Sequence, residues 1–262
     1  MTVLMPLLFV VCLWFFSTGG ILWLNRLDAS THPASIFAIS VLCGPAVCGI
    51  LVSAPETGAS AAYLGFASSL IIWGWHEASF LMGFVAGPRR EACPSRARGW
   101  TRFRLATAAV IHHEVALACT ALALFTMTWG QPNQIAAHTF ALLFVMRLAS
   151  KLNIFLGVAN MNADMMPAHL DYLKSYFKKA PMNALFPFTF VGSVALTVWL
   201  YQASDSPAYA LLFILAALGV FENTILMLPL RDSKLWEIFT PRTQIYAETR
   251  PPMSGGHQEM IR

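Results

Sequence analysis

The chain has 262 residues, of which 57% are hydrophobic and only 11% are charged, and its mean hydropathy is +0.59. A soluble domain of this length would need far more charge to cover its surface. The composition therefore excludes an ordinary water-soluble protein and indicates a polytopic membrane protein. The formal net charge of +4 gives no case for nucleic-acid binding, because it follows from where the cations lie between apolar segments.

Seven apolar runs, each of about 20 residues or more, predict seven transmembrane helices and an all-α fold. The first run has no basic residue before it and no small-residue cleavage pattern after it, so we interpret it as a retained span and not as a signal peptide. Residues 1–228 are thus expected to form one seven-helix transmembrane domain. In chain order the runs cover residues 3–24, 34–54, 60–86, 105–128, 135–158, 183–202 and 207–228.

The Lys and Arg residues outside these runs all lie in alternate connections. The amino terminus and the loops at 55–59, 129–134 and 203–206 hold none of them. Since Lys and Arg in short loops stay on the cytoplasmic side, we predict a periplasmic amino terminus and a cytoplasmic carboxyl terminus. Contact with anionic lipid is the expected use of the exposed cations. The cations of the predicted cytoplasmic side are Arg26, Arg89, Arg90, Arg96, Arg98, Arg102, Arg104, Lys174, Lys178, Lys179, Arg231, Lys234, Arg242, Arg250 and Arg262.

Two segments on the predicted cytoplasmic side have patterns of their own. In "PAHLDYLKSYFKKAP", Leu170, Leu173 and Phe177 share one helical face, which predicts an amphipathic helix at about 165–180 in the membrane surface. Residues 229–262 are expected to form a cytoplasmic tail. This tail is predicted to be partly disordered, because its final part is rich in Pro, Gly and polar residues.

Ionisable residues interrupt the apolar runs at a similar depth. One example is "ATAAVIHHEVALACTALAL", where a His-His-Glu triplet stands in the middle of a hydrocarbon-like segment. Each such group costs roughly 2.5 kcal/mol or more near the bilayer centre, so it needs a partner, a ligand or a task. At about 1.5 Å per residue, three carboxylates lie roughly 15 Å from the cytoplasmic ends of their runs, near two cations of the fifth run. The layer predicted in this way contains Glu77, Glu114, Glu222, Arg147 and Lys151 together with nearby histidines.

Two interpretations of this layer stay open. The first is a buried ion network in which Arg147 and Lys151 neutralise two of the three carboxylates, since charges inside membranes usually pair with one another. The second is a metal or tetrapyrrole site, because imidazole and carboxylate ligate iron and zinc, and His also ligates haem or chlorophyll metals. The spacing is not diagnostic, and the Glu-x-x-His pairs of a di-iron bundle are absent from the sequence. The candidate cofactor-binding residues are His76, His112, His113, Arg147, Lys151 and Asn153, and the candidate metal ligands are Glu77, His113, Glu114 and Glu222.

Five stretches of the chain resemble a known family. They are "WGWHEASFLMGFVAGPRR", "TRFRLATAAVIHHEVALA", "WGQPNQIA", "MRLASKLNIFLGVANMN" and "PAHLDYLKSYFKKAPMNALFP". In this order they are similar to the PuhE family, the photosynthetic complex assembly proteins of purple phototrophic bacteria. The resemblance covers roughly residues 14–236, and it carries over no catalytic residue.

The resemblance implies a multi-pass protein of the bacterial inner (intracytoplasmic) membrane that acts in the assembly of reaction-centre or light-harvesting complexes and in bacteriochlorophyll supply. The lipid bilayer, reaction-centre or light-harvesting subunits and bacteriochlorophyll are the partners it implies. The alternative function is an integral membrane metal-dependent oxidoreductase acting on a tetrapyrrole or quinone, which the shared depth of His and Glu favours. A transporter is a third class, and the lack of an evident inverted repeat argues against it.

Overall fold

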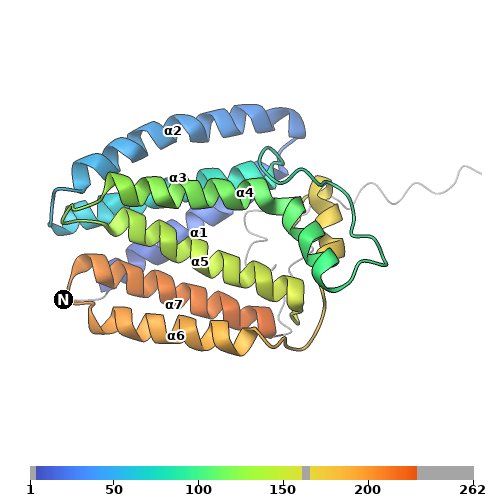
Figure 1. Ribbon diagram of the computed structural model, residues 1–262. Coiled ribbons are helices and arrows are strands. Elements are labelled where there is room, and N and C mark those ends of the chain that lie inside the picture. The colour runs from blue at the N-terminus through green and yellow to red at the C-terminus, as the bar shows by residue number, and fades with distance from the viewer. Residues whose placement is uncertain (1–3, 161–165, 229–262) are drawn as a thin grey trace, which may run out of the picture.

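The computed structural model describes residues 4–160 and 166–228. These two ranges contain seven α-helices, two 3-10 helices and no β-strand, apart from one isolated bridge between Val158 and Lys179 (Figure 1). The predicted tail at 229–262 lies outside the described residues. The elements in chain order are α1 (Leu4–Arg26), η1 (Ala29–Thr31), α2 (His32–Ser53), α3 (Ala59–Leu81), α4 (Gly99–Met127), α5 (Ile135–Leu156), η3 (Ala168–Tyr176), α6 (Phe186–Gln202) and α7 (Pro207–Met227).

The chain is an all-helical, multi-pass membrane protein. Five helices, namely α1, α2, α4, α5 and α7, are long and apolar enough to cross a membrane. Helix α6 is apolar but has only 17 residues. Helix α3 has 23 residues but is not among these five helices. The count of seven spans and the orientation of the termini therefore remain predictions.

Helix α3 lies at the centre of the bundle and contacts α1, α2, α4, α5 and α7. Phe66 on α3 is fully buried in a cluster with Leu211 of α7 and Val10 of α1. A second cluster joins α2 to α4 and α5 through Ile50, Leu117 and Phe140. The helices approach closely where α3 has small residues, as is common in membrane bundles. A Cβ on Gly65, for instance, would lie 2.6 Å from the side chain of Ile135.

Asparagine side chains tie the end of α5 to the start of α6. Helix α5 ends before Gly157, whose φ of 136° is a conformation that favours glycine. Asn183 donates from Nδ2 to the Gly157 carbonyl at 2.8 Å, while its Oδ1 accepts from the backbone N–H of Leu185 and Phe186. The side chain thus caps α6 and holds it against the carboxyl end of α5.

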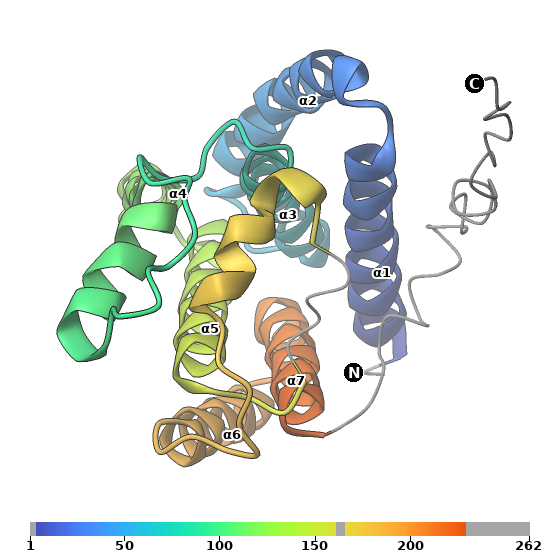
Figure 2. The ribbon, with the colours of Figure 1, turned by 90° about the vertical axis from the view of Figure 1, so that its right-hand side faces the viewer.

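The segment expected to form an amphipathic helix at about 165–180 contains the 3-10 helix η3. With three residues per turn, Leu170, Leu173 and Tyr176 lie on one side, so Tyr176 takes the place predicted for Phe177. These three side chains are buried against Phe80 of α3 and Ala109 of α4. The apolar face of η3 therefore packs on the bundle, at the end viewed in Figure 2.

A candidate polar site between three helices

Two ion pairs connect α5 to its neighbours inside the bundle. Arg147 donates from Nη2 to Glu77 Oε2 of α3 at 3.1 Å, and Lys151 donates from Nζ to Glu114 Oε1 of α4 at 2.5 Å. The cations are four residues apart, so they project from one face of α5. The side chains of Glu77, Glu114 and Lys151 are 13%, 16% and 21% exposed, whereas that of Arg147 is 42% exposed. The two cation–carboxylate pairs of the first interpretation are therefore present, although Arg147 is exposed.

His113 lies beside this network and is fully buried. Its ring packs on Phe80 of α3, with 4.6 Å between the ring centroids. Both ring nitrogens are buried and have no hydrogen-bond partner among the described residues. The ring is close enough to interact electrostatically with Lys151, Arg147 and His76. His113 is therefore the member of the site whose polar atoms are least satisfied by protein.

His76 joins the same layer from α3. Its Nε2 lies 2.9 Å from Thr120 Oγ1 of α4, while its Nδ1 is buried and has no partner in the described ranges. Thr120 was not predicted as part of the site. It follows His113 by seven residues, and this spacing places both on one face of α4, so the helical period could have identified it.

Each ion-paired carboxylate also leaves one oxygen buried and without a partner in the described part of the chain. These atoms are Oε1 of Glu77 and Oε2 of Glu114. An unsatisfied buried acceptor typically costs about 1–3 kcal/mol, more when it is charged, so water or a shared proton is expected at such atoms. The polar layer, which we define as His76, Glu77, His113, Glu114, Arg147 and Lys151, thus has more acceptors than the described donors satisfy.

Of the other predicted site residues, one is buried and two are exposed. Asn153 is buried but ties α5 to α6, since its Nδ2 donates to Thr189 Oγ1 at 2.9 Å and to the Ala149 carbonyl at 3.0 Å. His112 is exposed on α4, and Glu222 is exposed on α7. Within the described residues, no three His, Cys, Asp or Glu side chains form a group that could hold a metal ion. Metal ligation by Glu77, His113, Glu114 and Glu222 stays a prediction.

The loop after α3 packs directly onto the backbone of α4. The His113 N–H donates to the Ala86 carbonyl at 3.0 Å, an acceptor outside the helix, whereas a regular α-helix would direct it to Ala109. A Cβ on Gly87 would lie 2.2 Å from the Ala108 carbonyl oxygen, so only glycine allows this approach. Helix α4 bends near this contact, and its first turns are inclined to the rest (Figures 1 and 2). The loop therefore helps to set the position of His113.

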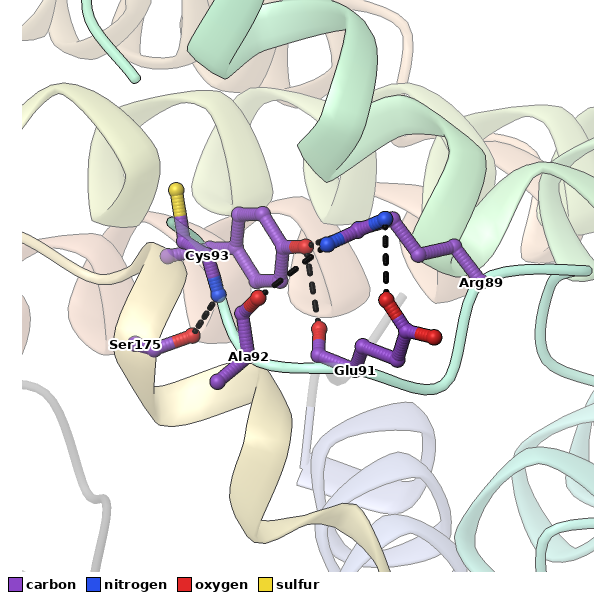
Figure 3. A network of polar contacts seen from close by, with 6 residues as sticks. Arg89, Glu91, Ala92, Cys93 and Ser175 are labelled. Carbon is purple, nitrogen blue, oxygen red and sulfur yellow. Dashed lines mark hydrogen bonds and ion pairs between the residues drawn. The ribbon is translucent and has the colours of Figure 1, made fainter. Parts of the chain in front are cut away.

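The same loop continues into a latch at one end of the bundle, which we define as Arg89, Glu91, Cys93, Ser175 and Tyr176 (Figure 3). Arg89 donates from Nε to Tyr176 Oη at 2.8 Å and pairs with Glu91 at 3.2 Å. The hydrogen bond with Tyr176 raises the pKa of Arg89 above its ordinary value. The Cys93 N–H donates to Ser175 Oγ at 2.7 Å. The latch therefore holds η3 against the loop that follows α3.

Comparison with known proteins gives two matches. A family model described as "Protein of unknown function (DUF3623)" matches residues 1–246. A protein of Rhodobacter capsulatus named "Uncharacterized 30.4 kDa protein in puhA 5'region" is 35% identical over 251 residues, which cover 91% of each chain. No solved structure matches the chain. The family match includes every residue of the polar layer and of the latch.

Proposed function

Because the chain belongs to the family described as "Protein of unknown function (DUF3623)", we propose its function from its similarity to the relative of the puhA 5' region. The proposed function is assembly of photosynthetic reaction-centre and light-harvesting complexes, with bacteriochlorophyll supply, in the bacterial inner (intracytoplasmic) membrane. The observation that carries it is the 35% identity over 91% of both chains. The puh prefix in the relative's name agrees with the resemblance of five sequence motifs to the PuhE family.

The polar layer is the part of the bundle that we propose to be essential for this role. Two ion pairs, together with the hydrogen bond between His76 and Thr120, fix the rotation of α3, α4 and α5 relative to one another. Reaction-centre or light-harvesting subunits are the proposed protein partners. On this proposal these subunits contact the helical bundle within the lipid bilayer.

A tetrapyrrole does not fit at His113 in the described packing. His113 is 0% exposed, one face of its ring lies on Phe80, and its backbone N–H donates to the Ala86 carbonyl. The unpartnered ring nitrogens are instead suited to a small group such as water. We therefore assign no step of the proposed function to a bound bacteriochlorophyll or haem.

The alternative, a metal-dependent oxidoreductase acting on a tetrapyrrole or quinone, has weaker support. It needs several ligands around one ion, and the described residues bring no such group together. The assembly role needs no metal, and it is the better supported of the two proposals.

Complementation of a strain that lacks the native gene tests the proposal. Wild-type protein should restore reaction-centre and light-harvesting absorbance. We expect His113→Ala to accumulate near normally in the membrane, because it creates no unpaired charge, and yet to fail to restore the complexes. His112→Ala, on the exposed face of α4, is the matched control and should restore them. Normal complexes in the deletion strain itself would refute the assembly role. Full restoration by His113→Ala would show that the polar layer is not essential for that role.

A further inference from the structure

The first turn of α4 and the last turn of α5 enclose an open groove of about 400 Å³. Its lining is aromatic and basic, and it contains no acidic residue. The two helices that border it are long and apolar enough to cross a membrane, so the groove opens where such helices leave the bilayer. The principal lining residues are Trp100, Arg102, Phe103, Phe155, Leu156 and Lys178.

Arg102 is held rigidly at the base of the groove. It donates from Nη1 to the Phe155 carbonyl at 3.2 Å and from Nη2 to the Tyr176 carbonyl at 2.5 Å. Its guanidinium carbon also lies 4.2 Å from the centroid of the Phe155 ring. Because a guanidinium has five N–H donors in a fixed plane, these two bonds leave donors for an anion. The cation is thus positioned before any ligand arrives.

Lys178 supplies a second cation at the rim. Its stem passes close to Gly157, where a Cβ would lie 3.7 Å from Lys178 Cδ, and its side chain is exposed. No carboxylate in the described ranges forms an ion pair with Arg102 or Lys178, although other cations of this end are paired, such as Lys174 with Asp171 at 2.7 Å. The positive charge of the groove is therefore not neutralised by the described part of the chain.

The apolar wall of the groove has the character of a membrane interface. Trp100 is 71% exposed and stacks on Phe103, with 5.1 Å between the ring centroids. Tryptophan side chains are favoured at the level of lipid headgroups, where one part of the ring is apolar and another can bond to water. Leu156, also exposed, extends this wall from α5. A ligand that fits must carry an anionic head and an apolar body.

We propose that this groove binds an anionic phospholipid of the leaflet at this end of the bundle. The phosphate lies against Arg102 and Lys178, and the glycerol and upper acyl chains lie against Trp100, Phe103 and Leu156. Basic pockets between membrane-spanning helices are suited to anionic headgroups. The first turn of α4 lies at the positive end of the helix dipole and adds to the favourable potential. This site goes beyond the proposed assembly function and does not depend on it.

The test is retention of lipid by the purified full-length protein, measured by native mass spectrometry with phosphatidylglycerol or phosphatidylcholine in the detergent. Wild-type protein should retain phosphatidylglycerol in preference to phosphatidylcholine. Lys178→Gln should lower that retention roughly fivefold, the factor that corresponds to loss of one cation near an anionic lipid surface. Trp100→Ala should also lower it. Both residues are exposed, so both variants should keep the melting temperature of the wild-type protein.

Two matched controls make the test specific. Lys174→Gln removes a cation from η3 outside the groove, and Trp129→Ala removes a tryptophan that is 80% exposed beyond the other end of α4. Both should retain phosphatidylglycerol as the wild type does. Equal retention of the two lipids by wild-type protein would overturn the proposal, as would an equal loss in Lys174→Gln and Lys178→Gln. Displacement of the lipid by millimolar glycerol phosphate would indicate a free-phosphate site and would also overturn it.

Discussion

Replacement of Glu114 by glutamine should destabilise the bundle strongly, because it leaves the Lys151 ammonium without its carboxylate. The two side chains are only 16% and 21% exposed, and their charged atoms are 2.5 Å apart. Breaking a buried pair by removing one partner costs about 3–5 kcal/mol. The ring of Phe80 lies 5.4 Å from Lys151 Nζ, and such a cation–π contact, worth up to about 2 kcal/mol, offsets part of this loss. We therefore expect a cost near the lower end, about 3 kcal/mol.

The double variant Glu114→Gln/Lys151→Met tests whether the charges of Glu114 and Lys151 stabilise each other. It removes both charges, and replacement of a whole buried ion pair by uncharged side chains is often neutral or stabilising. Unfolding titrations of the purified protein in mixed detergent should therefore place the double variant closer to wild type than Glu114→Gln alone. Glu91→Gln, which removes a carboxylate that is 76% exposed, is the control and should change stability by less than about 0.5 kcal/mol. If the double variant loses as much as the two single variants added together, the pair is not coupled and the reasoning is wrong.

Three further predictions follow from features outside this pair. Gly87→Ala should destabilise the protein by about 1–3 kcal/mol in the same titration, because its Cβ would overlap the backbone of α4, and a wild-type midpoint would contradict the close approach. Tyr176→Phe should cost about 1 kcal/mol by removing the acceptor of Arg89 Nε, and no loss of stability would mean that the latch hydrogen bond contributes nothing. A periplasmic reporter fused after Pro132 should be active and one fused after Ser95 inactive, as the division of loop cations requires, and the reverse pattern would invert the topology.

Helix boundaries were predictable where local signals agree. The last run was expected at 207–228 and α7 covers Pro207–Met227, because Pro207 suits a first helical turn and the apolar pattern is uninterrupted. The run at 60–86 was predicted too long, since α3 ends at Leu81 and Gly83 adopts a φ of 79°. Hydropathy could not reveal this, because Val85 and Ala86 are apolar although they lie in a loop, where Ala86 is buried in a cluster with Ala109 of α4.

The start of α4 shows the opposite error. The helix begins at Gly99, six residues before the predicted run, because "GWTRFR" is helical but too basic to count as hydrocarbon-like. Apolarity reports where a segment can lie in lipid, and a helix can extend beyond that zone. This extension contributes the wall of the proposed lipid groove, so the hydropathy pattern could not predict the site.

The polar layer was predictable in depth but not in rotation. A rise of about 1.5 Å per residue placed Glu77, Glu114 and Glu222 at one depth, with Lys151 at a similar level and Arg147 one turn deeper. Glu77 and Glu114 form ion pairs with these two cations. Which side of its helix each residue faces depends on packing against neighbours, which a single run does not encode. For that reason His112 and Glu222, at a suitable depth, are exposed.

The docking of the loop onto α4 also limits which insertions and deletions this loop can accept. Connections normally tolerate insertions and deletions, because their backbone is solvated and their ends are free to adjust. Between Gly83 and Arg89, however, the backbone has fixed contacts with the next helix, including the bonds from His113 N–H to Ala86 and from Arg89 N–H to Ala108. One added residue there would shift every later contact and displace His113 from Phe80. Length should therefore be as constrained in this connection as inside a helix.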